Sequence, residues 1–321
     1  MTQPATSPVR PAPAPGTIAF TKGHGTRNDF VLIADPEGAL DLGPKDVRRL
    51  ADRRGGIGAD GVIRLAPTAA LAREGDEAAQ AALAENPAAE WFMDYRNADG
   101  SVAEMCGNGV RVLAAFAERE GLADLSGGPL SLGTRGGVKR VTKESGGWYA
   151  VHMGSWFLPG GDAAVSDGYD AAVAVHGWTA PRPALSVDLG NPHTVVALAS
   201  VEELDSLELT HAPEVAPRPL HGTNVELVVP LGEEEGPDGV VGRLRMRVHE
   251  RGVGETPSCG TGACAAALAV RTWQGGTSGD GAPDIWIVEV PGGEVRVRIL
   301  AGGTVELAGP AELVYSGQVV R

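Results

Sequence analysis

Two cysteines have the setting in this 321-residue sequence that best suits chemistry. Cys106 and Cys259 each open a Cys-Gly-x-Gly turn that leads into a small, apolar stretch, and the pattern predicts helices over 107–120 and 260–273. A thiol at a helix N-terminus lies beside unpaired backbone N–H groups and the positive end of the helix dipole. We therefore expect a lowered pKa and a substantial thiolate fraction at neutral pH for both thiols.

Having two such turns is more informative than having one. Inversion of a stereocentre by proton transfer needs a base on one face of the carbon and an acid on the other, and two thiols meet that need. The same N–H groups can bind a substrate carboxylate. Cys264, one helical turn beyond Cys259, is interpreted as a packing residue. The turns therefore predict a cofactor-independent racemase or epimerase.

Other uses of cysteine remain open or fit less well. Both thiols could be small buried packing groups, or they could belong to a redox-sensing or ligand-binding module without turnover. The sequence has no Cys-x-x-Cys and no short-spaced Cys and His grouping for zinc. Residues 56–61 match Gly-x-Gly-x-x-Gly, but charged residues precede them and a strand-like segment follows, so we reject a dinucleotide-binding interpretation.

Composition limits the possible partners. The chain has 27 Lys and Arg against 41 Asp and Glu, a formal charge of −14, which opposes binding to nucleic acid or anionic membranes. No run of 18 apolar residues occurs, the N-terminal sequence lacks a secretory pattern, and three cysteines are too few for a disulfide scaffold. We expect a cytoplasmic protein that acts on a small molecule.

The predicted elements favour an α+β fold rich in antiparallel sheet. Residues 1–16 contain five prolines and predict a disordered tail. Two further helices are expected, Pro44–Ala51 and a surface segment over 71–83. Predicted strands cover 17–22, 30–34, 61–65, 148–153, 187–189, 225–229, 244–249, 285–290 and 294–300. The recurrence of the cysteine turn about half a chain length later suggests two similar halves.

Six separated motifs resemble those of the diaminopimelate epimerase family. They are Phe20–Phe30, Asp52–Gly61, Tyr95–Ser101 with Cys106–Arg111, Gly190–His193, Gly222–Glu226, and His249–Thr256 with Cys259–Gly262. The resemblance implies interconversion of LL- and meso-diaminopimelate for lysine and peptidoglycan synthesis, without pyridoxal phosphate or metal. It also implies that Cys106 and Cys259 are the acid and base.

The resemblance assigns further residues to the site. The backbone at Gly107, Asn108, Gly260 and Thr261 should hold the α-carboxylate. The positions that match family substrate-binding residues are Asn28, Asn97, Asn191, Asn224, Glu250 and Arg251. His193 and Glu250 match positions that tune thiol protonation, although a His after Asn-Pro can equally be structural.

The resemblance further implies two pseudo-symmetric domains, each a mainly antiparallel sheet or open barrel around a central helix. The expected domains are 17–150 with 307–321, and 151–306, and a homodimer is expected. At Gly61 some family members carry a Gln that contacts substrate, so this contact is absent or replaced here. The rival within the same broad fold is a two-thiol racemase of proline, hydroxyproline or histidine; the Asn residues and Arg251 favour a second polar head group instead.

Overall fold

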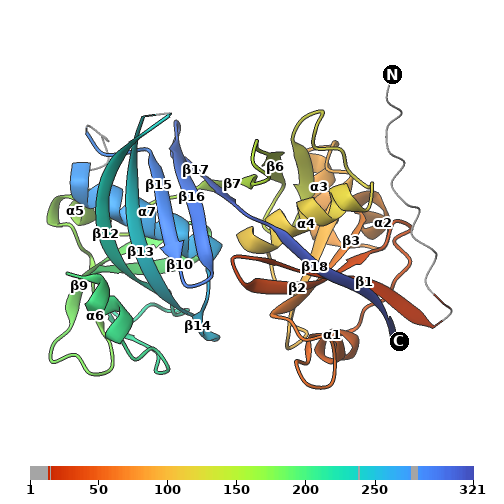
Figure 1. Ribbon diagram of the computed structural model, residues 1–321, viewed down its shortest axis with the longest axis horizontal. Helices are drawn as coiled ribbons and strands as arrows, with labels where there is room; N and C mark the ends of the chain where they lie inside the picture. The colour runs from red at the N-terminus through yellow and green to blue at the C-terminus, as the bar shows by residue number, and fades with distance from the viewer. Residues whose placement is uncertain (1–13, 15, 238, 276–280) are drawn as a thin grey trace.

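The computed structural model describes residues 14, 16–237, 239–275 and 281–321. Almost all of the predicted tail, residues 1–13 and 15, lies outside the described residues. The described chain forms the predicted α+β fold, with two sheet-bearing halves that lie side by side in Figure 1. None of the helices in the described ranges is long and apolar enough to cross a membrane.

The strands follow one another in an open series of pairings. In pairing order the first part is β18 (Glu312–Val320), β1 (Thr17–Gly25), β2 (Asn28–Ala34), β3 (Gly61–Pro67), β4 (Trp91–Asn97), β5 (Leu130–Gly133), β6 (Lys139–Lys143) and β7 (Tyr149–Ser155). The second part is β17 (Thr304–Gly309), β16 (Gly293–Leu300), β15 (Ile285–Val290), β13 (Gly239–Glu250), β12 (Asn224–Gly236), β10 (Pro192–Ala197), β9 (Arg182–Asp188), β8 (Ala171–Ala174) and β11 (Glu214–Ala216). The short β14 (Gly254–Thr256) pairs with β13, and β7 joins the two parts by pairing with β17.

The two halves repeat the same order of strand directions. From β1 to β7 the successive pairs are antiparallel, parallel, antiparallel, parallel, antiparallel and antiparallel. The series β9, β10, β12, β13, β15, β16, β17 gives the same six directions. The predicted pseudo-symmetry is therefore confirmed in the backbone, and β2, β3 and β4 correspond to β10, β12 and β13.

Each half is built around one buried helix. Helix α4 (Gly107–Arg119) follows β4, and α7 (Gly260–Gly275) follows β13 and β14, so the helices occupy corresponding places. Both sequences are rich in Ala and Gly, and nearly every residue in the first turns of each helix is buried. Small side chains let the sheets approach the helices closely, which explains why helices with weak amphipathic character form the core.

Several helices and strands differ from the sequence-based expectation. The single helix expected over 71–83 is wrong: the segment forms α2 (Thr68–Arg73) and α3 (Glu77–Glu85). The break has a local cause, because Gly75 has a φ of +94° and the Asp76 side chain accepts a hydrogen bond from the Ala79 N–H, which caps α3. The β12 and β13 strands are also longer than predicted.

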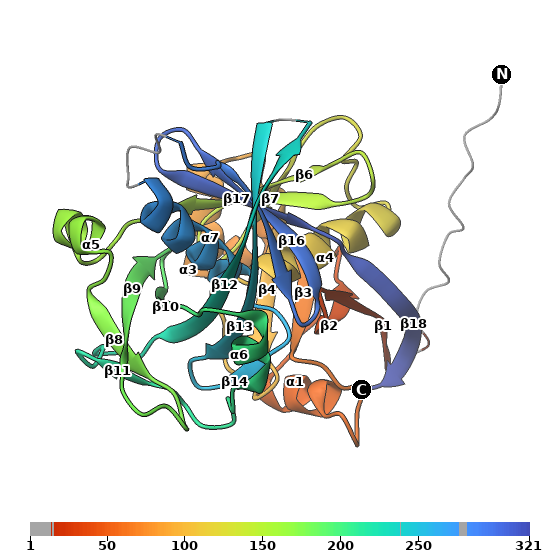
Figure 2. The same cartoon turned by 60° about the vertical axis from the view of Figure 1, so that its left-hand side comes forward.

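Three shorter helices complete the fold. Helix α1 (Pro44–Ala51) has the predicted bounds and joins β2 to β3, whereas α6 (Val201–Ser206) joins β10 to β12 at the corresponding place. Helix α5 (Gly161–Asp167) was not predicted. The last strand, β18, returns to the first half and pairs with β1 along its length (Figures 1 and 2).

Candidate active site

The first cysteine turn places Cys106 at the N-cap of α4. Its backbone is extended (φ −140°, ψ 120°), and the residue as a whole is partly exposed. The thiol donates a hydrogen bond to the Asn28 side-chain oxygen, with an Sγ–Oδ1 distance of 3.4 Å. Gly107 leaves no room for a side chain, because a Cβ there would lie 3.0 Å from Met153 and 3.1 Å from Leu307. The glycine therefore lets α4 begin directly against the sheet.

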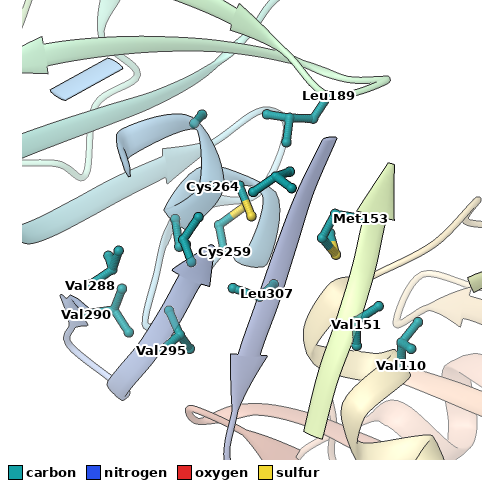
Figure 3. Close-up of a cluster of buried hydrophobic side chains, with 14 of the residues drawn as sticks. Val110, Val151, Met153, Leu189, Cys259, Cys264, Val288, Val290, Val295 and Leu307 are labelled. Carbon is teal, nitrogen blue, oxygen red and sulfur yellow. The ribbon is translucent and has the colours of Figure 1, made fainter. Parts of the chain in front are cut away.

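The second turn repeats this packing. Cys259 directly precedes α7 and is 7% exposed. The Gly262 N–H donates to its Sγ at 3.4 Å, and the Thr261 hydroxyl lies 3.6 Å from the same sulfur. A Cβ on Gly260 would lie 2.9 Å from Leu307, so one leucine of β17, labelled near Cys259 in Figure 3, lies against the first glycine of both helices.

The two helix N-termini meet. The Asn108 side-chain N–H₂ donates to the Ser258 carbonyl at 3.1 Å, and the Asn108 backbone nitrogen is 3.5 Å from the position of a Cβ on Gly260. The Thr26 hydroxyl donates to the Ser258 hydroxyl at 2.7 Å. The two thiol-bearing turns, far apart in the sequence, thus share one site at the junction of the halves.

Asn28 is held in a defined orientation by the loop before β3. Its side-chain N–H₂ donates to Asp60 at 2.8 Å, so its oxygen faces Cys106 and also accepts from Asn108 at 3.3 Å. Asp60 in turn accepts from Arg53 at 2.7 Å. Residues 56–61 therefore lead into a strand and support the Asn28 amide, in agreement with the rejection of a dinucleotide loop.

Of the predicted site residues of the second half, Asn191 contacts the Cys259 turn, whereas Asn224 and Arg251 contact each other. The Asn191 side chain donates to the Thr261 hydroxyl at 3.3 Å. The Asn224 side-chain oxygen accepts from the Arg251 backbone N–H at 2.9 Å. The Arg251 guanidinium donates to the His221 carbonyl at 2.9 Å and lines a cavity of about 830 Å³ with residues of the 212–223 loop.

Asn97 lies at the end of β4, opposite Gly61 in the β3–β4 ladder, and its side chain donates to Ser101 at 3.0 Å. A Cβ on Gly61 would lie 2.5 Å from the Tyr95 ring. Tyr95 thus occupies the space that a side chain at position 61 would need.

Buried charged groups surround the thiols. The Glu250 carboxylate is bonded by the Thr256 hydroxyl, and burial raises the Glu250 pKa. His193 Nδ1 lies 2.7 Å from Glu226 Oε1, and both side chains are fully buried. Arg111, on α4, is also fully buried, and burial lowers its pKa to about 10. Sequence reasoning missed Glu226, Asp60 and Arg111; the signal for Glu226 and Arg111 was a charge inside an apolar stretch.

The expectation of acidic thiols is wrong for this structure. Burial raises the pKa of Cys106 to about 11; the N–H groups of Gly109 and Asn108 lower it, and Glu250 raises it. Burial also raises the Cys259 pKa well above its usual range, with Glu250 and Glu226 adding to the rise. The helix N-termini act in the expected direction, but desolvation and nearby carboxylates outweigh them.

Comparisons with known proteins agree with this arrangement. A family profile described as diaminopimelate epimerase matches residues 20–158 and 185–314. The chain is 45% identical to the diaminopimelate epimerase of Streptomyces coelicolor, covering 94% of this chain and 95% of that protein. It is 43% identical to that of Thermobifida fusca, covering 94% and 98%. The chain belongs to the diaminopimelate epimerase family.

Some solved structures resemble this diaminopimelate epimerase family member in fold alone. A PhzF-family phenazine biosynthesis protein of Bacillus anthracis has a TM-score of 0.60 at 13% identity, covering 95% of this chain and 99% of that one. A hydroxyproline epimerase of Agrobacterium vitis has a TM-score of 0.57 at 15% identity, covering 96% and 93%. The rival assignment to a proline or hydroxyproline racemase therefore gains support only from the shared fold.

Proposed function

We propose that this protein interconverts LL- and meso-diaminopimelate by proton transfer between Cys106 and Cys259. Membership of the family makes the chain an isomerase. The observation that carries the mechanism is the meeting of two helix N-termini, each with a thiol at its start. One thiolate removes the α-proton while the opposite thiol donates a proton, and the reverse reaction exchanges the roles. The chain's own thiols supply acid and base, so the proposal calls for no pyridoxal phosphate and no metal.

The paired helix ends also suit the substrate's α-carboxylate. In this proposal the backbone N–H groups at Gly107, Asn108, Gly260 and Thr261 bind the carboxylate and the charge that spreads into it when the α-carbon loses its proton. The side chains proposed to bind the rest of the substrate are Asn28, Asn97, Asn191, Asn224, Glu250 and Arg251. Arg251 suits the distal carboxylate because its guanidinium can bind two oxygens at once.

The raised thiol pKa values fit this chemistry. An α-proton is weakly acidic, so a thiolate with a high pKa is a stronger base for it than an acidified thiolate. Because the thiol pKa values are raised, only a small fraction of the thiols is deprotonated before substrate binds. A bound substrate brings its ammonium group beside the thiols, and a nearby positive charge favours the thiolate. His193, which is buried, and Glu250, which is partly buried, are proposed to tune this balance.

We also propose two domains, residues 17–150 with 307–321 and residues 151–306. The boundaries between them fall within β7 and β17, which pair with each other. A homodimer is supported by β18, an edge strand of the described sheet that exposes Val314, Tyr315 and Val320. Size-exclusion chromatography with light scattering tests the dimer. A cytoplasmic location suits the mechanism, because a reducing compartment keeps both thiols free.

Incubation with LL-diaminopimelate in deuterated water tests the proposed activity. Conversion to the meso isomer with one deuterium at the inverted α-carbon, measured by mass spectrometry and chiral chromatography, is the expected result. L-Proline and trans-4-hydroxy-L-proline serve as comparison substrates and should not exchange. Failure of diaminopimelate to exchange, or faster exchange of a proline, would contradict the proposal.

A further inference from the structure

A buried pair of polar side chains lies beneath the Cys259 turn. His193 and Glu226 meet at 2.7 Å, Nδ1 to Oε1, with both side chains fully buried. The β10–β12 ladder pairs His193 with Asn224, and Glu226 follows Asn224 by two residues on β12. Paired residues share a face of a sheet, as do residues two apart, so all three side chains lie on one face.

This face packs against the start of α7. A Cβ placed on Gly262 would lie 2.7 Å from Glu226 Oε1 and 3.3 Å from the Cys259 sulfur. Gly262 thus leaves the space that the carboxylate fills. The charge of Glu226 raises the pKa of Cys259, which directly precedes α7. It also raises the pKa of Glu250, at the end of β13. Glu226 therefore acts on groups that take part in the proposed chemistry.

Filling this space with His193 and Glu226 costs free energy, because both are polar and buried. His193 Nε2 and Glu226 Oε2 are buried and have no hydrogen-bond partner among the described residues. Buried charges with unsatisfied atoms are often replaceable by apolar groups without loss of stability. Buried polar atoms left unpaired in a native protein call for an explanation such as a catalytic role.

The first half shows that the fold does not need the pair. In the β2–β3 ladder, Phe30 and Ile63 occupy the places that His193 and Glu226 occupy in the β10–β12 ladder. There a Cβ on Gly109 would lie 3.0 Å from Ile63 and 3.4 Å from Phe30. The same backbone is thus supported by apolar side chains beneath one cysteine turn and by a hydrogen-bonded His–Glu pair beneath the other.

We propose that Glu226 is a positioning residue for epimerisation, which holds the His193 ring with Nδ1 as the hydrogen-bond donor and leaves the buried Nε2 as a free acceptor. A carboxylate only accepts hydrogen bonds, so Nδ1 carries the proton of the neutral ring. In this tautomer the Nε2 lone pair is free to accept a proton or a hydrogen bond. The carboxylate of a catalytic triad fixes the tautomer of its histidine in the same way. The inference rests on the proposed function, and its test includes a measurement that does not depend on activity.

The activity test replaces Glu226→Gln. The amide keeps the shape but can donate as well as accept, so the His193 tautomer is no longer imposed. We expect kcat to fall at least about tenfold and KM to stay within roughly threefold, since Glu226 need not touch substrate. The pH profile should also change. The matched control is Glu289→Gln, a surface charge on β15 paired with Arg243, which should leave kcat unchanged.

Nitrogen NMR of the wild-type protein gives the independent measurement. With labelled histidines, a long-range ¹H–¹⁵N spectrum reports which ring nitrogen is protonated, and His193→Gln identifies the signal among the seven histidines. We expect the Nδ1–H tautomer in the wild type and its loss in Glu226→Gln. An Nε2–H tautomer in the wild type would overturn the proposal, even if the variant fails to fold. Unchanged kcat and tautomer in Glu226→Gln would also overturn it, whereas an inactive wild type with the Nδ1–H tautomer refutes only the proposed function.

Discussion

The turns at Cys106 and Cys259 share a backbone design and differ in what lies beneath them. Both helices begin on glycines that pack against Leu307, and both follow strands with the same order of directions. Beneath the first turn lie Phe30 and Ile63, whereas beneath the second lie His193 and Glu226. The repeated backbone therefore fixes where the thiols stand, and the side chains beneath it make the two thiols chemically unequal.

Exposure adds to this inequality. Cys106 is partly exposed and its thiol faces the Asn28 oxygen, whereas Cys259 is buried and has two carboxylates among the groups that raise its pKa. Glu250 raises the pKa of both thiols, and Glu226 adds to the rise at Cys259, so a formally symmetric mechanism has unequal thiols. Four predictions break or sharpen this comparison.

The largest effect is expected from removal of either thiol. Cys106→Ser and Cys259→Ser should each reduce epimerisation at least about 100-fold, because a general acid or base typically contributes 10²- to 10⁴-fold. The assay is conversion of LL-diaminopimelate, with circular dichroism as the control for folding. Cys264→Ser should retain activity, since that thiol lies within the helix core. A fully active variant at either turn would refute the two-base mechanism.

Replacing the His–Glu pair of the second half with the apolar pair of the first half should have different effects on stability and on activity. The double variant His193→Phe with Glu226→Ile carries the apolar pair of the first half. We expect its unfolding free energy to be unchanged or higher by up to about 4 kcal/mol, and its kcat to be at least about tenfold lower. Denaturant unfolding and the epimerase assay measure the two quantities.

The single variant Glu226→Ile is the control for that experiment. It leaves the buried Nδ1–H of His193 without its acceptor, so a loss of about 1–3 kcal/mol is expected. If the double variant is no more stable than the single variant, the two halves are not interchangeable at these positions.

Alkylation should distinguish the thiols by exposure and pKa. At pH 8, iodoacetamide should modify Cys106 roughly tenfold faster than Cys259, since the thiolate is the nucleophile and Cys259 is both buried and beside two carboxylates. The Cys106 rate should continue to rise toward pH 11, because its pKa lies near 11 and deprotonation is incomplete below it. Peptide mapping by mass spectrometry measures both rates. A Cys106 rate that levels off below pH 9 would show an acidic thiol instead.

The smallest effect is expected from Asp60→Asn. The amide at position 60 can no longer impose one orientation on the Asn28 side chain, and the pairing with Arg53 is lost. We expect kcat/KM to fall by roughly threefold to tenfold, about 1 kcal/mol, the size of one hydrogen bond. Asp284→Asn, which removes a surface pairing with Arg271, is the control and should have no effect. An equal loss in both variants would point to general destabilisation.

Local patterns in the sequence carry much of the fold. The bounds of α1 agree with the prediction, and the starts of α4 and α7 are marked by the glycines after each cysteine. The repeat of the cysteine turn also indicated two similar halves. The break between α2 and α3 was missed because the Ala-rich composition favours helix on both sides, whereas one Gly in a left-handed conformation decides the backbone path.

The electrostatics could not be predicted in the same way. The effect of a helix N-terminus on a thiol is local and therefore visible in the sequence, whereas burial and the approach of Glu226 and Glu250 depend on packing between distant strands. Glu226 lies in an apolar strand, and only the partner on β10 explains its charge. Asp60 was set aside with its glycine-rich loop, yet it holds Asn28.

The return of β18 to β1 has a consequence for synthesis. The chain is made from its N-terminus, and domains generally fold as they emerge. Here the outer edge of β1 stays unpaired until residues 312–320 have been synthesised. The leucine that supports both helices lies at position 307. Both cysteines therefore leave the ribosome before the strands that join the two halves have been made. The site that brings the thiols together can form only after these last strands are synthesised.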